Sequence, residues 1–258
     1  MRVGGLKRLL RGTIAHRIYR RLAHGTESRV GDAGSSSQSA VYDRQTIEVM
    51  RRVLRADSSC VDIGAHQGDI LKHMIAIAPS GRHHAFEPLP HLAAELRRRF
   101  RAVRVHEVAL SDRNGEAEFQ YVENDPAYSG LRRRVYDRPD PVIVPIRVAV
   151  AMLDEIIPDG QPVAFMKLDI EGGEYHALKG ATNTIRRCHP VIAFEAGRKS
   201  TGEYGVTPTD LYGLVTETLG YDLSTMGRWL ERMPPMRREE FCHNWVDGPE
   251  FYFIATPT

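Results

Sequence analysis

Three carboxylates follow one another closely within residues 163–174. An apolar run over residues 163–166 precedes Asp169, Glu171 and Glu174, and two adjacent glycines lie among the acids. We interpret the run as a buried strand that presents these acids at its carboxyl end and then turns into a helix. Ligands bind at that edge of an open α/β sheet. The helix dipole favours an acid in the first turn, which explains Glu174 as a cap. Three carboxylates behind one core strand nevertheless indicate a binding or catalytic site.

A glycine loop follows another short apolar run, residues 59–63. It has the spacing Gly64-x-x-x-Gly68 after Asp62, without the lysine of a Walker loop or the third glycine of a dinucleotide fingerprint. About twenty residues later the next predicted strand ends in Glu87, and an acid there can accept both hydroxyls of a ribose. These residues predict a nucleoside site without a phosphate clamp. They suit S-adenosylmethionine, whose sulfonium and amino groups favour nearby acids, better than a nicotinamide dinucleotide.

Composition narrows the class of protein. With 258 residues, 42% of them hydrophobic, the chain can bury one large core, with or without an appendage. The sequence has no run of 18 apolar residues, so no membrane-spanning segment is predicted. A net charge of +2 argues against nucleic acid as the main partner. Cys60, Cys188 and Cys242 are odd in number and widely spaced, which favours a reducing cytosol and a cytoplasmic location.

The N-terminal 26 residues differ from the rest, because they hold seven Lys or Arg and no Asp or Glu. An apolar residue recurs every fourth position, at Leu6, Leu10, Ile14, Ile18 and Leu22. We expect either a helix on an anionic surface, such as the inner face of a membrane, or a helix packed on the domain. Residues 31–40 are predicted to be a flexible linker. The predicted division is therefore residues 1–40 and a domain over residues 41–258.

The remaining chain alternates between strand and helix patterns. Helices are predicted over residues 43–54, 70–78, 89–100, 152–157, 175–187 and 208–219. Strands are predicted over residues 59–63, 82–86, 103–110, 116–122, 142–150, 163–166, 190–195, 221–230 and 251–255. This alternation predicts an α/β fold with a mostly parallel sheet covered on both faces. The last two strands are expected to form an antiparallel edge around residues 231–249.

Several of these segments together resemble the FkbM-type S-adenosylmethionine-dependent methyltransferases. The matching motifs are residues 61–68, 86–88, 109–112 with Gly115, 153–154, 167–174, 178–180 and 194–195. The block Lys-x-Asp-x-Glu-Gly-x-Glu at residues 167–174 is the most specific. The resemblance implies a Rossmann-like class I methyltransferase fold with a seven-stranded sheet. It also implies methylation of hydroxyl groups, often on sugars, glycoconjugates or secondary metabolites. The family often has a bulkier residue at the position of Gly173.

The resemblance also implies cofactor-binding residues. The glycine loop would face the methionine half of the cofactor, and the acid after the second strand would hold its ribose. The stretch after the third strand would line the adenine. The expected set is Asp62, Gly64, Ala65, Gly68, Glu87, Pro88, Ala109, Leu110, Ser111, Asp112 and Asp169.

Methyl transfer to an alcohol requires removal of the hydroxyl proton as attack proceeds. Asp169 is the first candidate, either as the base or as the group that holds the cofactor's amino group. Glu171 or Glu195 would orient the acceptor hydroxyl, and His66 is an alternative base. Asp169, Glu171 and Glu195 could also hold Mg²⁺, although their spacing does not demand a metal. Lys167 is expected to be structural and to pair with a carboxylate.

The long irregular segment over residues 123–141 is predicted to grip a hydroxyl-bearing small-molecule or glycolipid acceptor. Tyr121, Tyr128 and Tyr136 offer stacking surfaces there, or serve packing alone. Two other functions stay open from the residues: a nicotinamide-dependent oxidoreductase, and a membrane-surface binding module with a degenerate nucleotide pocket. The first requires a fingerprint that the loop lacks, and the second rests on residues 1–26.

Overall fold

The computed structural model of the protein describes residues 35–136 and 139–258. The chain forms two compact units, Met1–Ser39 and Ala40–Thr258, and the second unit carries the sheets and the predicted site. The amphipathic helix predicted for residues 1–26 lies outside the described residues.

The predicted linker over residues 31–40 is wrong at its end, because α2 (Ser35–Val53) already begins there. Serine is only a moderate helix former. Most helical stability in proteins, however, comes from packing of an apolar face. Tyr42, Val49 and Met50 of α2 are 4%, 0% and 0% exposed, and this burial supports the helix through its serine-rich first turn.

Seven strands form the main sheet in the order β3-β2-β1-β7-β8-β10-β9. These strands are β1 (Cys60–Ile63), β2 (His84–Phe86), β3 (Arg104–His106), β7 (Phe165–Leu168), β8 (Val191–Glu195), β9 (Tyr221–Thr225) and β10 (Tyr252–Pro257). All pairings are parallel except those of β10, which runs antiparallel to both β8 and β9. The predicted mostly parallel sheet with an antiparallel C-terminal edge is confirmed. The outermost strand is β9, and β10 lies inside it.

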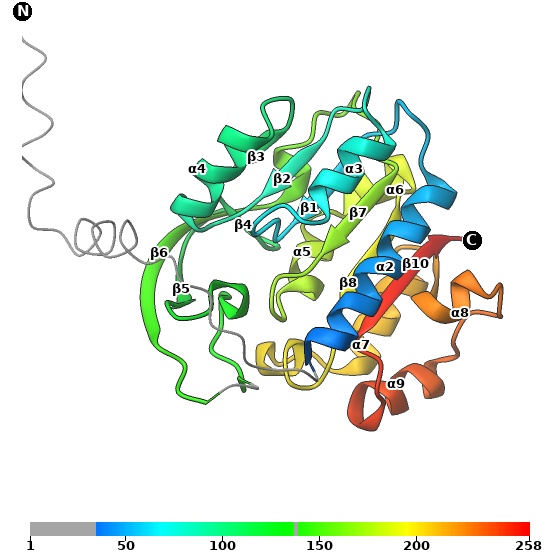
Figure 1. The fold of residues 1–258 in the computed structure, drawn as a ribbon. Coiled ribbons are helices and arrows are strands. Elements are labelled where there is room, and N and C mark those ends of the chain that lie inside the picture. The colour runs from blue at the N-terminus through cyan, green and yellow to red at the C-terminus, as the bar shows by residue number, and fades with distance from the viewer. Residues whose placement is uncertain (1–34, 137–138) are drawn as a thin grey trace, which may run out of the picture. The chain divides into compact units, whose positions relative to one another are not determined.

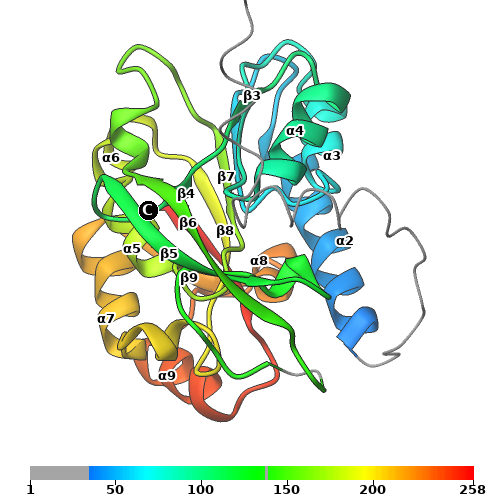
Figure 2. The ribbon, with the colours of Figure 1, turned by 90° about the vertical axis from the view of Figure 1, so that its left-hand side faces the viewer.

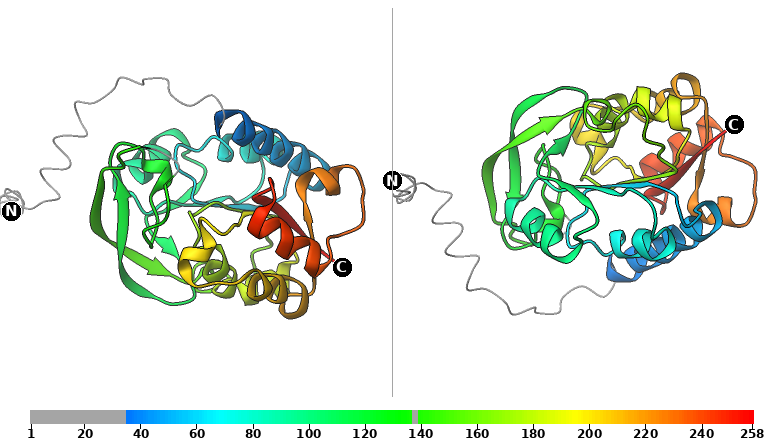
Figure 3. Two further views of the ribbon diagram at one scale, coloured as in Figure 1. Left: turned by 90° about the horizontal axis from the view of Figure 1, so that it is seen from below. Right: turned by 90° about the horizontal axis from the view of Figure 1, so that it is seen from above.

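Helices cover both faces of this sheet, as the views from below and above show (Figures 1 and 3). One buried cluster packs residues of α2, α3 (Leu71–Ile77), α4 (Pro90–Arg99) and α8 (Met226–Leu230) against one face. A second cluster packs α5 (Glu174–Lys179), α6 (Thr182–Cys188), α7 (Pro208–Gly213) and α9 (Arg238–Asp247) against the other face. The sheet therefore buries both surfaces, as its continuous apolar strands predict.

A second sheet of three strands has the order β4-β6-β5 (Figure 2). It consists of β4 (Ala109–Leu110), β5 (Gly115–Val122) and β6 (Ile143–Ala151), with β5 and β6 antiparallel. The single strand predicted over residues 103–110 is wrong, because the chain leaves the main sheet after β3 and β4 pairs with β6 instead. The sequence pattern does not reveal that β3 and β4 belong to different sheets, since both segments have a pattern typical of strands.

The helix predicted over residues 175–187 is divided into α5 and α6 at Gly180. A Cβ at Gly180 would lie 2.0 Å from the carbonyl oxygen of Ser111, so the break brings two backbones into contact. The strand predicted over residues 221–230 ends at Thr225, whose hydroxyl accepts a hydrogen bond from the Arg228 N–H and caps α8. Helix α9 lies in a stretch for which we predicted no element. Short helical turns complete the chain at η1 (Pro126–Tyr128), η2 (Leu153–Glu155), η3 (Thr201–Tyr204) and η4 (Leu214–Thr218).

Candidate active site

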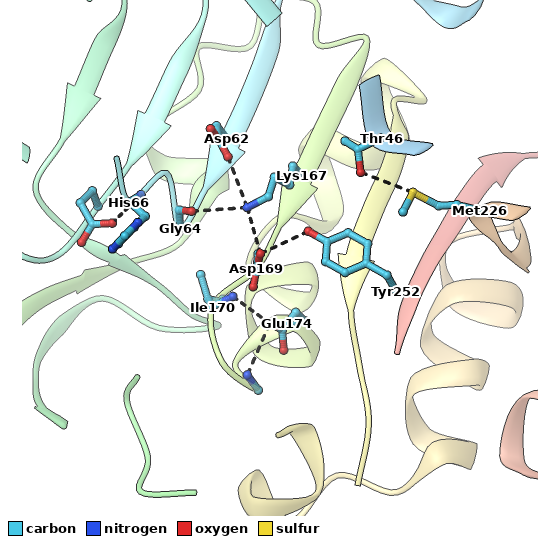
Figure 4. Close-up of polar contacts among 12 residues, drawn as sticks. Thr46, Asp62, Gly64, His66, Lys167, Asp169, Ile170, Glu174, Met226 and Tyr252 are labelled. Carbon is cyan, nitrogen blue, oxygen red and sulfur yellow. Dashed lines mark hydrogen bonds and ion pairs between the residues drawn. The ribbon is translucent and has the colours of Figure 1, made fainter. Parts of the chain in front are cut away.

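The carboxyl ends of β1 and β7 lie side by side and carry the central charged cluster. Asp62 is the register partner of Lys167, and the Asp169 N–H donates to the Ile63 carbonyl at 3.0 Å. Figure 4 shows the Lys167 ammonium between two carboxylates, 3.8 Å from Asp62 and 3.3 Å from Asp169. The prediction that these two strand ends adjoin is confirmed, as is the pairing of Lys167 with a carboxylate.

The two carboxylates differ in access to solvent. Asp62 is 1% exposed, whereas the side chain of Asp169 is 34% exposed. Burial raises the pKa of Asp62 to about 6, although the Lys167 ammonium opposes the shift. A ligand can therefore contact Asp169 directly, while Asp62 acts by holding Lys167 in place.

The glycine loop connects β1 to this cluster. Gly64 has a φ of +76°, and a Cβ on it would lie 1.9 Å from the Asp169 carbonyl oxygen. The N–H groups of Gly64 and Ala65 both donate to the Phe86 carbonyl, at 3.0 and 3.1 Å. Gly64 is therefore required both for the turn and for close approach to β7. Gly68, with a φ of +81°, packs against side chains at the end of α4, and its contact with the cofactor stays a prediction.

Glu87 lies at the carboxyl end of β2 and is 4% exposed. One carboxylate oxygen accepts a hydrogen bond from the His66 N–H at 2.9 Å, and the other accepts one from the Leu89 N–H at 3.0 Å. Burial raises the pKa of Glu87 to about 7, against the lowering effect of these two donors. Glu87 thus ties the glycine loop to β2, with partly buried Pro88 beside it. A ribose contact would use its remaining lone pairs.

The segment predicted to line the adenine is mostly buried. Ala109 and Leu110 form β4 and are 7% and 2% exposed, and Ser111 is 8% exposed. The carboxylate of Asp112 lies 3.1 Å from both His176 Nδ1 and Lys179 Nζ of α5. Asp112 therefore links the loop after β4 to α5. Contact of these four residues with adenine stays a prediction.

Asp169 accepts hydrogen bonds from two neighbouring strands. The Tyr252 hydroxyl of β10 donates to it at 3.4 Å, and Glu195 of β8 donates a carboxyl proton. Burial favours the neutral carboxyl, but Lys167 and these donors outweigh burial and hold the pKa of Asp169 below its usual range. A carboxylate held ionised is a good partner for a cation and a weak proton acceptor. The geometry therefore favours Asp169 as an anchor for an amino group over Asp169 as the base.

Glu195 has the opposite electrostatic character. Burial, together with the neighbouring carboxylates of Glu171 and Asp169, raises its pKa well above the usual value. It therefore carries the proton that it donates to Asp169. Two carboxyl groups sharing one proton is the expected outcome when like charges are crowded in a buried site.

Glu171 is held by a segment that we call the strap, residues 123–136. Arg134 of the strap forms an ion pair with Glu171, and the two side chains are 8% and 12% exposed. Gly130 of the strap also packs on Glu171, since a Cβ there would lie 3.3 Å from the Glu171 Cβ. Burial and nearby carboxylates raise the pKa of Glu171 to about 8, against the effect of Arg134. The strap therefore lies directly against the acid cluster.

The three tyrosines predicted as stacking surfaces have different positions. The Arg134 guanidinium lies over the rings of Tyr128 and Tyr136, at 4.9 and 5.8 Å from their centroids. Tyr121 belongs to β5 and is 2% exposed, so it serves packing. Tyr128 and Tyr136 thus hold the arginine that reaches the cluster, and stacking on an acceptor stays a prediction for them.

Glu174 is completely buried at the start of α5. Its Oε1 accepts hydrogen bonds from the Ile170 N–H at 2.9 Å and the Gly172 N–H at 3.4 Å. Burial raises its pKa to about 7 despite these donors. Glu174 lies in the first turn of α5, as predicted, but its donors precede the helix, so it closes the turn between β7 and α5 (Figure 4) and the predicted capping of the helix stays a prediction.

His66 lies in the glycine loop with a left-handed φ of 46°. Its backbone is bonded to Glu87, as described above, and burial lowers the pKa of its imidazole. The ring is therefore neutral near pH 7, as a general base must be. Its role as an alternative base stays a prediction.

Asp169, Glu171 and Glu195 each have a carboxylate oxygen within 4.8 Å of the others, a spacing that one cation could bridge. The structure gives these groups other partners, namely Lys167, Arg134 and a shared proton. The spacing therefore allows a cation but does not demand one.

Sequence reasoning missed two residues of this cluster, Arg134 and Tyr252. Arg134 lies in a run of arginines with no pattern that distinguishes it, and it reaches Glu171 only through the path of the strap. Tyr252 was assigned to a strand, but its position opposite Glu195 depends on the register of β10 on β8. The signal for both residues is tertiary.

The sheet order, with one antiparallel strand beside β8 and an acid-lined site at the carboxyl ends of β1 and β7, defines a Rossmann-like methyltransferase. Residues 62–229 match the methyltransferase FkbM domain, which is more than half of the chain. The protein therefore belongs to the FkbM family of S-adenosylmethionine-dependent methyltransferases. No curated protein matches the chain.

Solved structures with a similar fold include a methyltransferase FkbM from Methylobacillus flagellatus, with 18% identity and a TM-score of 0.49. That match covers 78% of this chain but 44% of the other, so this chain spans less than half the length of that protein. A TehB-like S-adenosylmethionine-dependent methyltransferase from Corynebacterium glutamicum matches at 13% identity and a TM-score of 0.42, over 95% and 96% of the two chains. A Streptococcus mutans methyltransferase solved with S-adenosylhomocysteine matches at 10% identity and a TM-score of 0.46, over 83% and 97%.

Within residues 35–136 and 139–258, none of the helices combines the length and the apolar character that crossing a membrane requires.

Proposed function

We propose that the protein is an O-methyltransferase that transfers the methyl group of S-adenosylmethionine to a hydroxyl of a sugar, glycoconjugate or secondary metabolite. One observation carries this proposal. At the adjoining ends of β1, β7 and β8, an ionised and partly exposed Asp169 lies beside the protonated carboxyl of Glu195. This pair provides both a partner for a cation and a group that can exchange a proton.

The charged side chains at this site fit S-adenosylmethionine, which carries positive charge. Five carboxyl groups gather here, those of Asp62, Asp169, Glu171, Glu174 and Glu195, with Lys167 and Arg134 as the cations that pair with them in the described chain. An excess of buried acids is costly unless cations or protons neutralise it. When bound, the cofactor supplies an electrophilic methyl group and a neutral thioether leaving group. Asp169 would hold its amino group and the Gly64 loop its methionine half.

The proton of the acceptor hydroxyl needs a carboxylate that is free to receive it. A cation held at Asp169 would lower the pKa of Glu195, because positive charge favours the ionised form. Glu195 would then lose its proton to solvent and could act as the base that the hydroxyl requires. Glu171 is paired with Arg134 and is better placed to orient the acceptor.

The acceptor class rests on the family resemblance and on the strap, which brings Arg134, Tyr128 and Tyr136 to the cluster. Aromatic rings beside a charged, hydrogen-bonding side chain suit a hydroxyl-rich ring. We retain the proposal of a cytoplasmic enzyme with peripheral membrane contact through residues 1–26. Co-sedimentation with anionic liposomes, comparing the full chain with a variant that lacks residues 1–30, tests that contact. No observation favours a nicotinamide cofactor.

Two experiments test the proposed function. Calorimetry with S-adenosylhomocysteine should give saturable binding, and its absence from the folded, purified protein would remove the proposal. Incubation with methyl-labelled S-adenosylmethionine and crude glycolipid or metabolite extracts should then label an acceptor through an alkali-stable ether. Label found on nitrogen, sulfur or an ester would contradict hydroxyl methylation.

A further inference from the structure

A second concave site lies away from the acid cluster, between the edge of the main sheet and α8. The cavity has a volume of about 440 Å³. Its lining combines basic, aromatic and hydroxyl side chains: Arg52, Asp222, Ser224, Trp229, Arg232, Met233, Pro235 and Thr256. Asp222 is the second residue of β9, and β9 runs parallel to β8 because both are antiparallel to β10. The cavity therefore lies along the outermost strand β9, three strands away in the sheet from β7, which Asp169 follows.

Arg232 occupies a backbone position that favours glycine. The N–H groups of Arg232 and Met233 donate to the carbonyls of Trp229 and Arg228, at 3.0 and 2.9 Å, which is the Schellman pattern at a helix end. The left-handed residue of this pattern is usually glycine, but here Arg232 adopts a φ of +59°. A side chain in that conformation is strained, and strained residues often serve a ligand.

Two side chains of the cavity lining, those of Arg52 and Arg232, carry positive charge. Arg52 is held in place, since its Nη1 donates to the Leu230 carbonyl at 2.8 Å and its Nε to Glu48 at 3.0 Å. The Arg232 guanidinium has no ion pair or hydrogen bond within the described part of the chain. A guanidinium without a partner can receive a carboxylate or phosphate in bidentate geometry.

The other walls of the cavity suit a planar apolar body. Trp229 is partly buried and Met233 is 48% exposed, so an indole and a thioether face the same space. Ser224, at the buried side, is 5% exposed, and its hydroxyl has no hydrogen-bond partner among the described residues. Asp222 would repel a second negative charge and favour an amino or hydroxyl group near it. Rings stack well on both indole and guanidinium planes.

We propose that this cavity binds a small organic anion with a planar ring, through Arg52 and Arg232 at its charged end and Trp229 at its apolar end. This site is separate from the methyl-transfer site. The chemistry that it recognises is a carboxylate or phosphate attached to an aromatic or similarly flat group. Neither half of the ligand alone should bind as well as the two joined.

Phenyl phosphate is a suitable probe, with inorganic phosphate and phenol as its two halves. Titration of the full chain, in saturating S-adenosylhomocysteine, should change the tryptophan fluorescence with a Kd of about 0.1–1 mM, the range that its size allows. Each half alone should bind at least fivefold more weakly. If either half alone bound as tightly as phenyl phosphate, the proposal would be overturned. A signal present without S-adenosylhomocysteine and lost with it would overturn the proposal as well, because it would place the probe in the methyl-transfer site.

The variant Arg232→Gly separates binding from folding. Glycine relieves the left-handed strain, so its Tm should rise by about 2–4 °C, while the Kd for phenyl phosphate should increase at least tenfold. Arg52→Gln should also weaken binding, whereas Arg51→Gln, one residue away and outside the lining, should leave it unchanged. Wild-type affinity in Arg232→Gly would overturn the proposal, as would equal losses in Arg51→Gln and Arg52→Gln.

Discussion

Tyr252 and Glu195 are direct partners in the antiparallel pairing of β10 with β8, and both donate a hydrogen bond to Asp169 at the end of β7. Three strands far apart in the sequence thus converge on one carboxylate. Lys167 and these two donors together hold the pKa of Asp169 below its usual range, whereas burial, with the neighbouring carboxylates, raises the pKa of Glu195.

Asp169→Asn removes the charge that would hold a cationic group. We expect turnover to fall at least 100-fold and the affinity for S-adenosylmethionine to fall about tenfold, because a hydrogen bond to a charged group contributes about 1.5–3 kcal/mol. Methyl transfer and calorimetry check these values. Asp159→Asn, which changes an exposed acid paired with Arg187, should keep wild-type values. A rate near wild type in Asp169→Asn would remove the assigned role.

Tyr252→Phe deletes one donor to Asp169 and keeps the ring that stacks on Tyr42. Because the pKa of Asp169 should rise, we expect turnover to fall about three- to tenfold and the acid limb of the pH–rate profile to move upward. Tyr42→Phe is the control, since its hydroxyl donates to Glu250 at 2.8 Å. Identical pH profiles for wild type and Tyr252→Phe would show that the hydroxyl does not position Asp169.

Lys167→Met leaves Asp62 buried without its cation. Removing one partner of a buried pair typically costs about 3–5 kcal/mol in the free energy of unfolding, and urea denaturation at pH 8 measures it. Lys179→Met, which removes a half-exposed ammonium from Asp112, should cost less than about 1 kcal/mol. The double variant Asp62→Asn with Lys167→Met should recover part of the loss. Equal costs for the two single variants would contradict the assignment of a buried pair.

Glu174 should make the ligand-free protein less stable as pH rises. Its folded pKa of about 7 lies above the unfolded value of 4.5, so its contribution is complete below about pH 4.5 and is lost as pH rises through 7. Asp62, with a folded pKa of about 6, should change the stability in the same direction as pH rises. The free energy of unfolding should therefore fall between about pH 4 and pH 7 and level off above that range.

The matched variant for this prediction is Glu174→Gln, whose amide oxygen can still accept from the Ile170 N–H. It should flatten the decline and be more stable than wild type at pH 8, by an amount on the order of 1–3 kcal/mol. Parallel curves of stability against pH for the two proteins would show that Glu174 does not titrate in this range.

Gly173→Ala and Gly180→Ala form a matched pair at the two ends of α5. A Cβ at Gly180 would lie 2.0 Å from the Ser111 carbonyl oxygen, which belongs to backbone and cannot move aside. A Cβ at Gly173 would meet the end of the Ile170 side chain at 3.2 Å, at an ordinary φ of −77°. We expect Gly180→Ala to cost about 3 kcal/mol and Gly173→Ala less than about 1 kcal/mol. Thermal and urea unfolding provide the comparison, and equal losses would contradict it.

Local pattern was sufficient for most elements and for the acids at the strand ends. The apolar runs before Asp62, Glu87, Asp169 and Glu195 each form a strand of the main sheet. The prediction failed where the chain changes partners, as at Glu107 between β3 and β4, and where backbones touch, as at Gly180. Apolar periodicity records which face of an element is buried, but it carries no information about the element that covers it.

The sequence by itself determined that acids and a glycine loop end several buried strands, because strand and turn formation depend on neighbouring residues. Only the tertiary structure decided which of these acids pairs with a cation and which has a raised pKa. Lys167 reaches both Asp62 and Asp169, Arg134 reaches Glu171 from the strap, and Tyr252 arrives on the last strand. The pKa of a carboxyl group depends on burial and on charges within a few ångströms, and those distances arise only when strands distant in the chain pair.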